Sequence, residues 1–178
     1  MTELLRICVT GPECSGKTTM AERLARVLGT EWVPEAARLY AERTPRALTD
    51  ADVSPIAREH IALADAAAAR AGSAGTDLIV LDTDLVSTLV YSRHYYGDAP
   101  AWIEPEARAR LADLYLLCDV DIPWVADGIR DQPDNRGGMF ERFRAELERL
   151  GACIVVIRGA GDERCVIADG AVGARIRR

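Results

Sequence analysis

The sequence predicts an α/β fold in which a five-stranded parallel sheet is flanked by helices. Two observations carry this prediction. Short apolar segments alternate with helical segments along the chain, and a G-x-x-x-x-G-K-[ST] loop directly follows the first apolar segment. Strands of a parallel sheet are buried on both faces and have this continuous apolar character, and a loop of this kind binds phosphate between a strand and a helix. The predicted class is therefore a P-loop NTPase fold.

The elements follow from local patterns. Residues 4–9 form the first apolar run, and Met20, Leu24 and Leu28 then repeat at helical spacing after the loop. The alanine-rich stretch beyond Ser54 follows a capped helix start and ends at Gly72, which indicates a helix. Strands are expected at 4–9, 32–33, 78–81, 114–117 and 153–157. Helices are expected at 17–28, 36–43, 54–71, 84–96, 104–111, 139–150 and 162–175.

The glycine-rich loop carries the clearest chemistry. Gly11 and Gly16 allow a turn in which backbone N–H groups surround a phosphate, and Lys17 adds a positive charge. Thr18 offers a hydroxyl to Mg²⁺, and the helix that starts here contributes the positive end of its dipole. The loop therefore predicts a nucleoside triphosphate site. Its candidate nucleotide-binding residues are Gly11, Pro12, Glu13, Cys14, Ser15, Gly16, Lys17, Thr18 and Thr19.

Acidic residues follow two of the predicted strands. Asp82 ends an apolar strand, as does the acid that holds Mg²⁺ beside many phosphate loops, so we predict Thr18 and Asp82 as metal ligands. Glu35 or Asp84 could accept a proton from a substrate hydroxyl or hold ribose hydroxyls, and the sequence leaves the choice open. Asp84 precedes a helix, so capping is an equal alternative there. Arg38 lies one helical turn after Glu35 and is predicted, with Glu35 and Asp84, to bind the substrate.

A long charged segment punctuated by Pro and Gly follows the fourth strand. We expect residues 120–138 to form a lid in which Arg130 and Arg136 neutralise charge on the transferring phosphate, the alternative being a solvated loop. Trp124 could stack on an aromatic substrate or anchor the loop to the core. The same alternative applies to four tyrosines, Tyr40, Tyr91, Tyr95 and Tyr96.

Composition bounds the remaining possibilities. The chain has 178 residues, enough for a single domain over 1–178 with a sizeable core. A net charge of −6 argues against a nucleic-acid-binding surface. The five cysteines form no C-x-x-C pair and are expected to be reduced thiols of a cytoplasmic protein. No apolar run approaches membrane-spanning length, so no membrane association is expected. The sequence does not indicate an oligomeric state.

Taken together, these motifs make the chain resemble the nicotinamide riboside kinase domain of the bacterial NadR family. The resemblance covers the loop and the blocks at 33–38, 81–84 and 115–131, of which the last is the most specific. It implies ATP as phosphoryl donor, Mg²⁺, and transfer to the ribose 5′-hydroxyl of nicotinamide riboside. It also implies that Trp124 contacts the nicotinamide ring and that Arg130 and Arg136 are lid arginines.

Members of that family often carry a nucleotidyltransferase domain, and sometimes a helix-turn-helix domain, ahead of the kinase. We expect neither adenylyl transfer nor DNA-dependent repression to carry over to this chain. Two rival hypotheses remain. The acceptor could be another nucleoside or a small alcohol, or the chain could be a regulatory P-loop ATPase that binds a protein partner.

Overall fold

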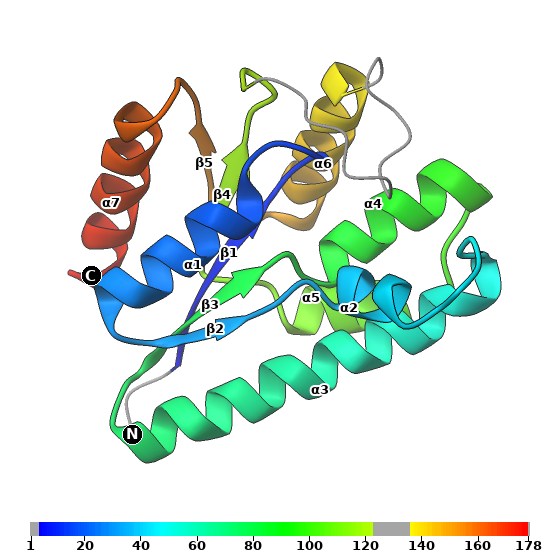
Figure 1. The fold of residues 1–178 in the computed structure, drawn as a ribbon, viewed down its shortest axis with the longest axis horizontal. Helices are drawn as coiled ribbons and strands as arrows, with labels where there is room; N and C mark the ends of the chain where they lie inside the picture. The colour runs from blue at the N-terminus through cyan, green and yellow to red at the C-terminus, as the bar shows by residue number, and fades with distance from the viewer. Residues whose placement is uncertain (1–3, 123–135, 178) are drawn as a thin grey trace.

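The computed structural model describes residues 4–122 and 136–177, and one parallel sheet lies at the centre of this part of the chain (Figure 1). Its five strands are arranged in the order β2-β3-β1-β4-β5. The strands are β1 (Leu5–Thr10), β2 (Glu31–Val33), β3 (Leu78–Asp82), β4 (Leu114–Cys118) and β5 (Ile154–Ile157). Each coincides with a predicted strand to within one residue at either end, and the predicted parallel sheet is confirmed.

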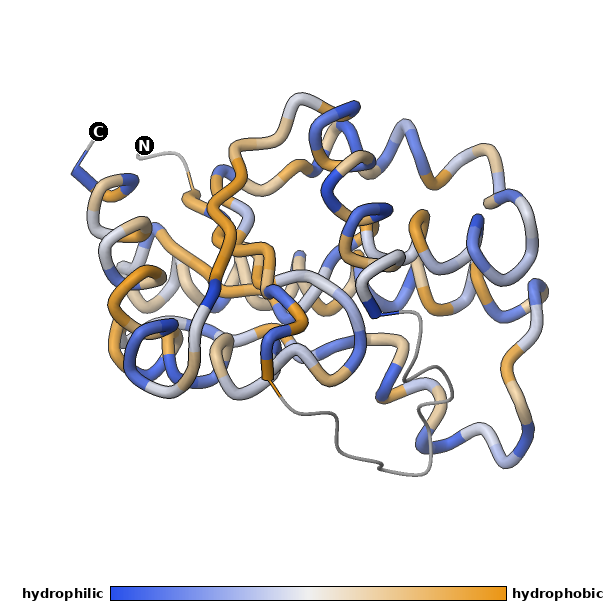
Figure 2. Tube along the Cα trace, turned by 90° about the horizontal axis from the view of Figure 1, so that it is seen from above, coloured by the Kyte–Doolittle hydropathy of each residue, from blue (hydrophilic) through white to orange (hydrophobic). Residues whose placement is uncertain are grey.

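Both faces of the sheet are buried. Along β4, Tyr115 and Leu117 pack into the apolar core on one face, whereas Leu114, Leu116 and Cys118 pack into the core on the other. Successive side chains of a strand point to opposite faces, so a continuous apolar run is what a strand covered on both sides requires. The strands accordingly stand out as hydrophobic stretches of the trace, while the helices alternate between hydrophobic and hydrophilic residues (Figure 2).

The helices divide between the two faces. Side chains of α1 and α7 build one core, and side chains of α3, α4, α5 and α6 build the other, while α2 packs against α3. The helices are α1 (Lys17–Leu28), α2 (Ala36–Glu42), α3 (Asp50–Ala74), α4 (Leu85–Tyr96), α5 (Ile103–Ala109), α6 (Arg136–Leu150) and α7 (Asp162–Ile176). None of the helices in the described part of the chain is both long and apolar enough to cross a membrane.

Three helix boundaries differ by three or four residues from those predicted. Helix α3 continues through Gly72, its predicted end, to Ala74, because Gly75 with φ +74° is its C-cap. Helix α3 begins at Asp50, four residues earlier than expected, because Thr49 is its N-cap. The N–H and hydroxyl of Thr49 both donate to the Asp52 carboxylate, at 2.8 and 3.0 Å. The Thr49 side chain in turn accepts from the Asp52 N–H. Such a reciprocal cap starts a helix more strongly than the Ser-Pro pair, and Pro55 is accommodated inside α3. Helix α6 begins at Arg136, so the last residues of the predicted lid are helical.

Candidate active site

The phosphate-binding loop joins β1 to α1 at the carboxyl edge of the sheet, in the upper middle of the view in Figure 1. Its glycines are required by geometry. Gly11 has φ +137°, and a Cβ at this position would lie 2.7 Å from the carbonyl oxygen of Cys118. Gly16 has φ +79°. Only glycine adopts such backbone angles without strain, and no side chain fits between the loop and β4 at Gly11.

Lys17 is buried at the first turn of α1, with 8% of its surface exposed. Its Nζ donates to the Pro12 carbonyl oxygen at 2.8 Å, and the Ser15 hydroxyl donates to the same oxygen at 2.7 Å. The ammonium group is thus held across the loop, where it can exchange a carbonyl for a phosphate oxygen. Lys17 is also the only lysine in the sequence.

Thr18 and Asp82 meet although 64 residues separate them. The Thr18 hydroxyl donates to Asp82 Oδ2 at 2.7 Å, and Asp82 ends β3 with 1% of its surface exposed. Its Oδ1 is buried and has no hydrogen-bond donor among the described residues. Burial and the nearby Glu35 carboxylate raise the pKa of Asp82 to about 6. A buried carboxylate with an unsatisfied oxygen beside a hydroxyl is a donor set that fits Mg²⁺.

Asp84 lies two residues further on, after Thr83 with φ +67°. A β-branched residue in this conformation is strained, and such strain is concentrated at functional sites. Asp84 caps α4: its Oδ1 accepts from the Val86 N–H at 2.9 Å, and its Oδ2 accepts from the buried Tyr115 hydroxyl. Burial raises the pKa of Asp84 to about 6, although both bonds oppose the shift. Capping is therefore one role of Asp84.

A cleft of 710 Å³ extends from the phosphate loop across α2, α3 and α4. Charged groups line the end near the loop, and aromatic side chains line the α4 side. The charged set comprises Glu13, Lys17, Glu35, Arg38 and Asp84; the aromatic set comprises Tyr91, Tyr95 and Tyr96. In the described residues, the Glu35 carboxylate accepts no hydrogen bond, whereas both oxygens of Asp84 do. The structure thus brings together most of the predicted acceptor-side residues, and it places three of the four tyrosines named from the sequence in the same cleft.

Of the two predicted lid arginines, Arg136 lies within the described residues. Arg136 is the first residue of α6, and its guanidinium donates to the carbonyl oxygens of Cys14, Val120 and Ile122 at 3.2, 3.2 and 2.9 Å. In this structure it therefore binds backbone of the phosphate loop and of the segment after β4. Arg130 and Trp124 lie outside the described residues.

Two residues of the predicted nucleotide-binding loop, Glu13 and Thr19, lie in different surroundings. Glu13, predicted to bind nucleotide, lines the acceptor-side cleft. Thr19 is exposed on α1.

Two buried polar residues of the site escaped the sequence analysis. Tyr115 is the second residue of the apolar strand β4, where a tyrosine is expected to be a core residue, yet its hydroxyl donates to Asp84. Arg164 lies on α7 and donates to the carbonyl oxygen of Ser15 at 2.7 Å. A tyrosine interrupting an aliphatic strand is a weak signal that could have marked the first. Nothing local marks the second, because its partner is 149 residues away.

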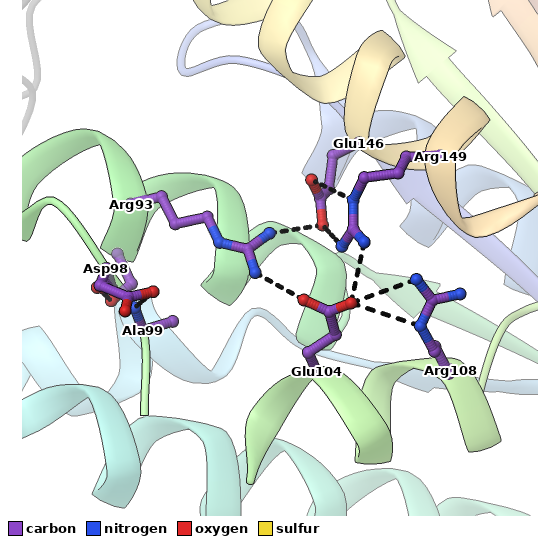
Figure 3. Close-up of polar contacts among 8 residues, drawn as sticks. Arg93, Asp98, Ala99, Glu104, Arg108, Glu146 and Arg149 are labelled. Carbon is purple, nitrogen blue, oxygen red and sulfur yellow. Dashed lines mark hydrogen bonds and ion pairs between the residues drawn. The ribbon is translucent and has the colours of Figure 1, made fainter. Parts of the chain in front are cut away.

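An ion-pair network supports α4 on the side of α5 and α6 (Figure 3). Arg93 of α4 binds Glu104 of α5 at 2.6 Å and Glu146 of α6 at 2.7 Å. Arg149 joins the same two glutamates, at 2.8 and 2.6 Å. The network ties together three helices, of which α4 carries the tyrosines of the cleft and α6 begins at Arg136.

Fold and site together define a P-loop nucleotide-binding domain. A family model described as an AAA domain matches residues 6–164, so the chain belongs to this family. Among curated proteins it is 30% identical over 128 residues to the trifunctional NAD biosynthesis/regulator protein NadR of Salmonella typhimurium, and equally to that of Escherichia coli. These alignments cover 70% of this chain and 30% of either relative.

Solved structures show the same fold. A crystal structure of NadR protein in complex with NR matches 97% of this chain and 50% of that chain, with a TM-score of 0.76 and 23% identity. Thymidylate kinase from Ehrlichia chaffeensis matches 97% of this chain and 99% of that chain, with a TM-score of 0.61 and 14% identity. The resemblance to NadR that the sequence predicts is confirmed. The chain spans about a third of the length of its curated relatives.

Proposed function

We propose that this protein transfers the γ-phosphoryl group of ATP to the 5′-hydroxyl of nicotinamide riboside, forming nicotinamide mononucleotide. The observation that carries the proposal is the cleft of 710 Å³, which leads from Lys17 past Glu35 and Asp84 to the tyrosines of α4. Its volume is within the range of small-molecule sites. The likeness to NadR supports nicotinamide riboside as the nucleoside.

Glu35 is the better candidate for general base. It lines the cleft near Asp82, and its carboxylate accepts no hydrogen bond from the described residues. Asp84 has both oxygens engaged by Val86 and Tyr115, which restricts its orientation. We therefore assign Glu35 to orient the 5′-hydroxyl and accept its proton, and Asp84 to hold a neighbouring ribose hydroxyl.

On the donor side, Thr18 and Asp82 would hold Mg²⁺, because the free buried oxygen of Asp82 is left for a cation. When bound, Mg²⁺ supplies charge neutralisation to the β- and γ-phosphates. Lys17 would release the Pro12 carbonyl and bind a phosphate oxygen, and the loop amides would surround the phosphates. Arg130 is proposed to approach the transferring group, whereas Arg136 would first have to leave the three carbonyls that it binds.

The aromatic part of the cleft suits a flat cationic ring. Tyr91 and Tyr95 are nearly parallel, with centroids 6.1 Å apart and planes 10° apart, and both line the cleft. A pyridinium ring is attracted to the faces of such rings. We propose that Trp124 makes an additional contact with the nicotinamide, and that Arg38 contributes to holding the acceptor.

The test is ADP release by the purified protein with MgATP, alone and with nicotinamide riboside, ordinary nucleosides or small alcohols, with the product identified by mass spectrometry. Stimulation by nicotinamide riboside, with the phosphorylated product detected, is expected. Stimulation by another compound instead would reassign the acceptor. A response indifferent to every acceptor would favour a regulatory ATPase.

The role of Glu35 has a matched control four residues earlier in the chain. Glu35→Gln should lower kcat by about a hundredfold or more, since general base catalysis contributes on that order, while leaving ATP affinity nearly unchanged. Glu31→Gln, at the first residue of β2, removes only an exposed ion pair with Arg70 and should keep wild-type turnover. Equal turnover in the two variants would exclude Glu35 as the base.

A further inference from the structure

The phosphate loop binds guanidinium groups through its own carbonyl oxygens. A loop that directs its N–H groups at a phosphate must turn other polar groups away from it, and these need partners elsewhere. The Ser15 carbonyl accepts from Arg164 at 2.7 Å, and the Cys14 carbonyl accepts from Arg136 at 3.2 Å. Cys14 itself has φ +52°, a conformation that costs free energy for a residue other than glycine. The loop shape therefore depends on bonds from outside the motif.

Arg164 is the stronger of the two partners. Its side chain projects from α7 and is 7% exposed. One guanidinium nitrogen binds Ser15, and the other binds Asp121 Oδ1 at 2.6 Å. The second oxygen of Asp121 accepts from the Gly159 N–H at 2.5 Å. The guanidinium is thus held between the loop and the segments that follow β4 and β5, and its orientation is determined by an ion pair.

We propose that Arg164 is a positioning residue for the nucleotide site: it holds the Ser15 carbonyl so that the phosphate loop has its binding shape before a nucleotide arrives. Its positive charge is neutralised by Asp121, so its contribution is geometric. When a loop is held in its bound shape beforehand, no binding free energy is spent on ordering it. Without Arg164, the strained backbone at Cys14 can relax to another conformation. Part of the free energy of nucleotide binding is then needed to return the loop to its binding shape.

A purely structural role predicts something different. Helix α7 is anchored to the sheet by apolar side chains, including the buried Ala168 and Val172, and these contacts do not involve Arg164. Loss of the guanidinium should therefore disturb the loop more than the fold. The proposal depends on the loop being the nucleotide site and is independent of which acceptor is phosphorylated.

The test compares three variants by binding of a fluorescent ADP analogue with Mg²⁺ and by urea unfolding without nucleotide. Arg164→Met should weaken ADP binding by about tenfold, the effect of losing one hydrogen bond from a charged group. Asp121→Asn should weaken it less. Arg175→Met is the matched control, because Arg175 lies on the same helix and forms an ion pair of 3.1 Å with Asp113. It should bind ADP like the wild type.

Steady-state kinetics provide a second readout with the acceptor found active. The KM for ATP should rise in Arg164→Met while the KM for the acceptor stays unchanged. Wild-type ADP affinity in Arg164→Met, or an equal loss in Arg175→Met, would overturn the proposal. If Arg164→Met does not fold, Asp121→Asn decides, and unchanged ADP affinity there overturns it. ADP binding needs no acceptor, so a failure of nicotinamide riboside phosphorylation would leave this test intact.

Discussion

Replacing Gly11 by alanine tests the close approach of the phosphate loop to β4. The added Cβ would lie 2.7 Å from the Cys118 carbonyl oxygen, well inside the contact distance of about 3.5 Å at which attraction is optimal. Overpacking of this kind costs about 1–3 kcal/mol, and the positive φ of +137° adds roughly 1–2 kcal/mol for a residue with a side chain. The expected loss is about 2–5 kcal/mol, a large fraction of a typical stability of about 5–15 kcal/mol.

Gly29→Ala is a control that has a positive φ but lacks the close contact; its φ lies in the left-handed helical region, whereas that of Gly11 lies outside it. Gly29 also has a positive φ, +62°, but a Cβ there would meet no heavy atom within 4 Å. Gly29→Ala should therefore lose only the part of the free energy of unfolding that comes from the positive φ. Any effect of alanine on the unfolded chain is common to both variants. The difference, about 1–3 kcal/mol, corresponds to a urea midpoint lower by about 1 M for Gly11→Ala.

Equilibrium urea unfolding followed by circular dichroism measures this difference directly. ADP binding should also weaken in Gly11→Ala, because the loop can relieve the contact only by moving away from β4. Equal midpoints for the two variants would refute the inferred contact between loop and strand. An unchanged ADP affinity in a destabilised Gly11→Ala would show that the loop does not move.

Three further predictions concern other parts of the molecule. Because Lys17 is the only lysine in the sequence, an acyl-phosphate derivative of ATP should acylate its side chain, and MgATP should protect it. Peptide mass spectrometry measures both effects, and acylation confined to the N-terminal amine would contradict the assigned nucleotide site. Burial lowers the pKa of His60 to about 4, so the unfolded chain takes up the proton first as the pH falls below about 6.5. Stability should therefore fall by about 2 kcal/mol more between about pH 7 and about pH 5 in the wild type than in His60→Gln, and parallel pH profiles from urea unfolding would disprove this. Arg93→Met should lower the free energy of unfolding by about 1 kcal/mol. Because the ion pairs of Arg93 are partly exposed, about 1 M salt should reduce the difference between wild type and variant, and a loss that salt does not change would indicate packing instead.

The phosphate loop and the sheet could be predicted because their signals are local. Gly11, Gly16 and Lys17 occupy fixed positions in one short motif, and each strand is a continuous apolar run. A buried parallel strand and a tight anion-binding turn can be recognised from a short stretch of sequence, because burial and backbone angles restrict which residues can stand at those positions. The start of α3 was mispredicted because two local signals competed, and the cap at Thr49 is the stronger.

By itself, the sequence determined the fold class, the order of the elements and the loop that would hold a nucleotide. Only the tertiary structure decided which distant groups meet at that loop: Thr18 with Asp82, and Ser15 with Arg164 across 149 residues. It likewise decided that Tyr115 holds Asp84 and leaves Glu35 as the carboxylate without a hydrogen-bond donor among the described residues. The physical reason is that a polar contact between elements depends on strand order and helix packing. These bring together residues that are far apart in the chain, and the local sequence around each residue does not indicate its partner.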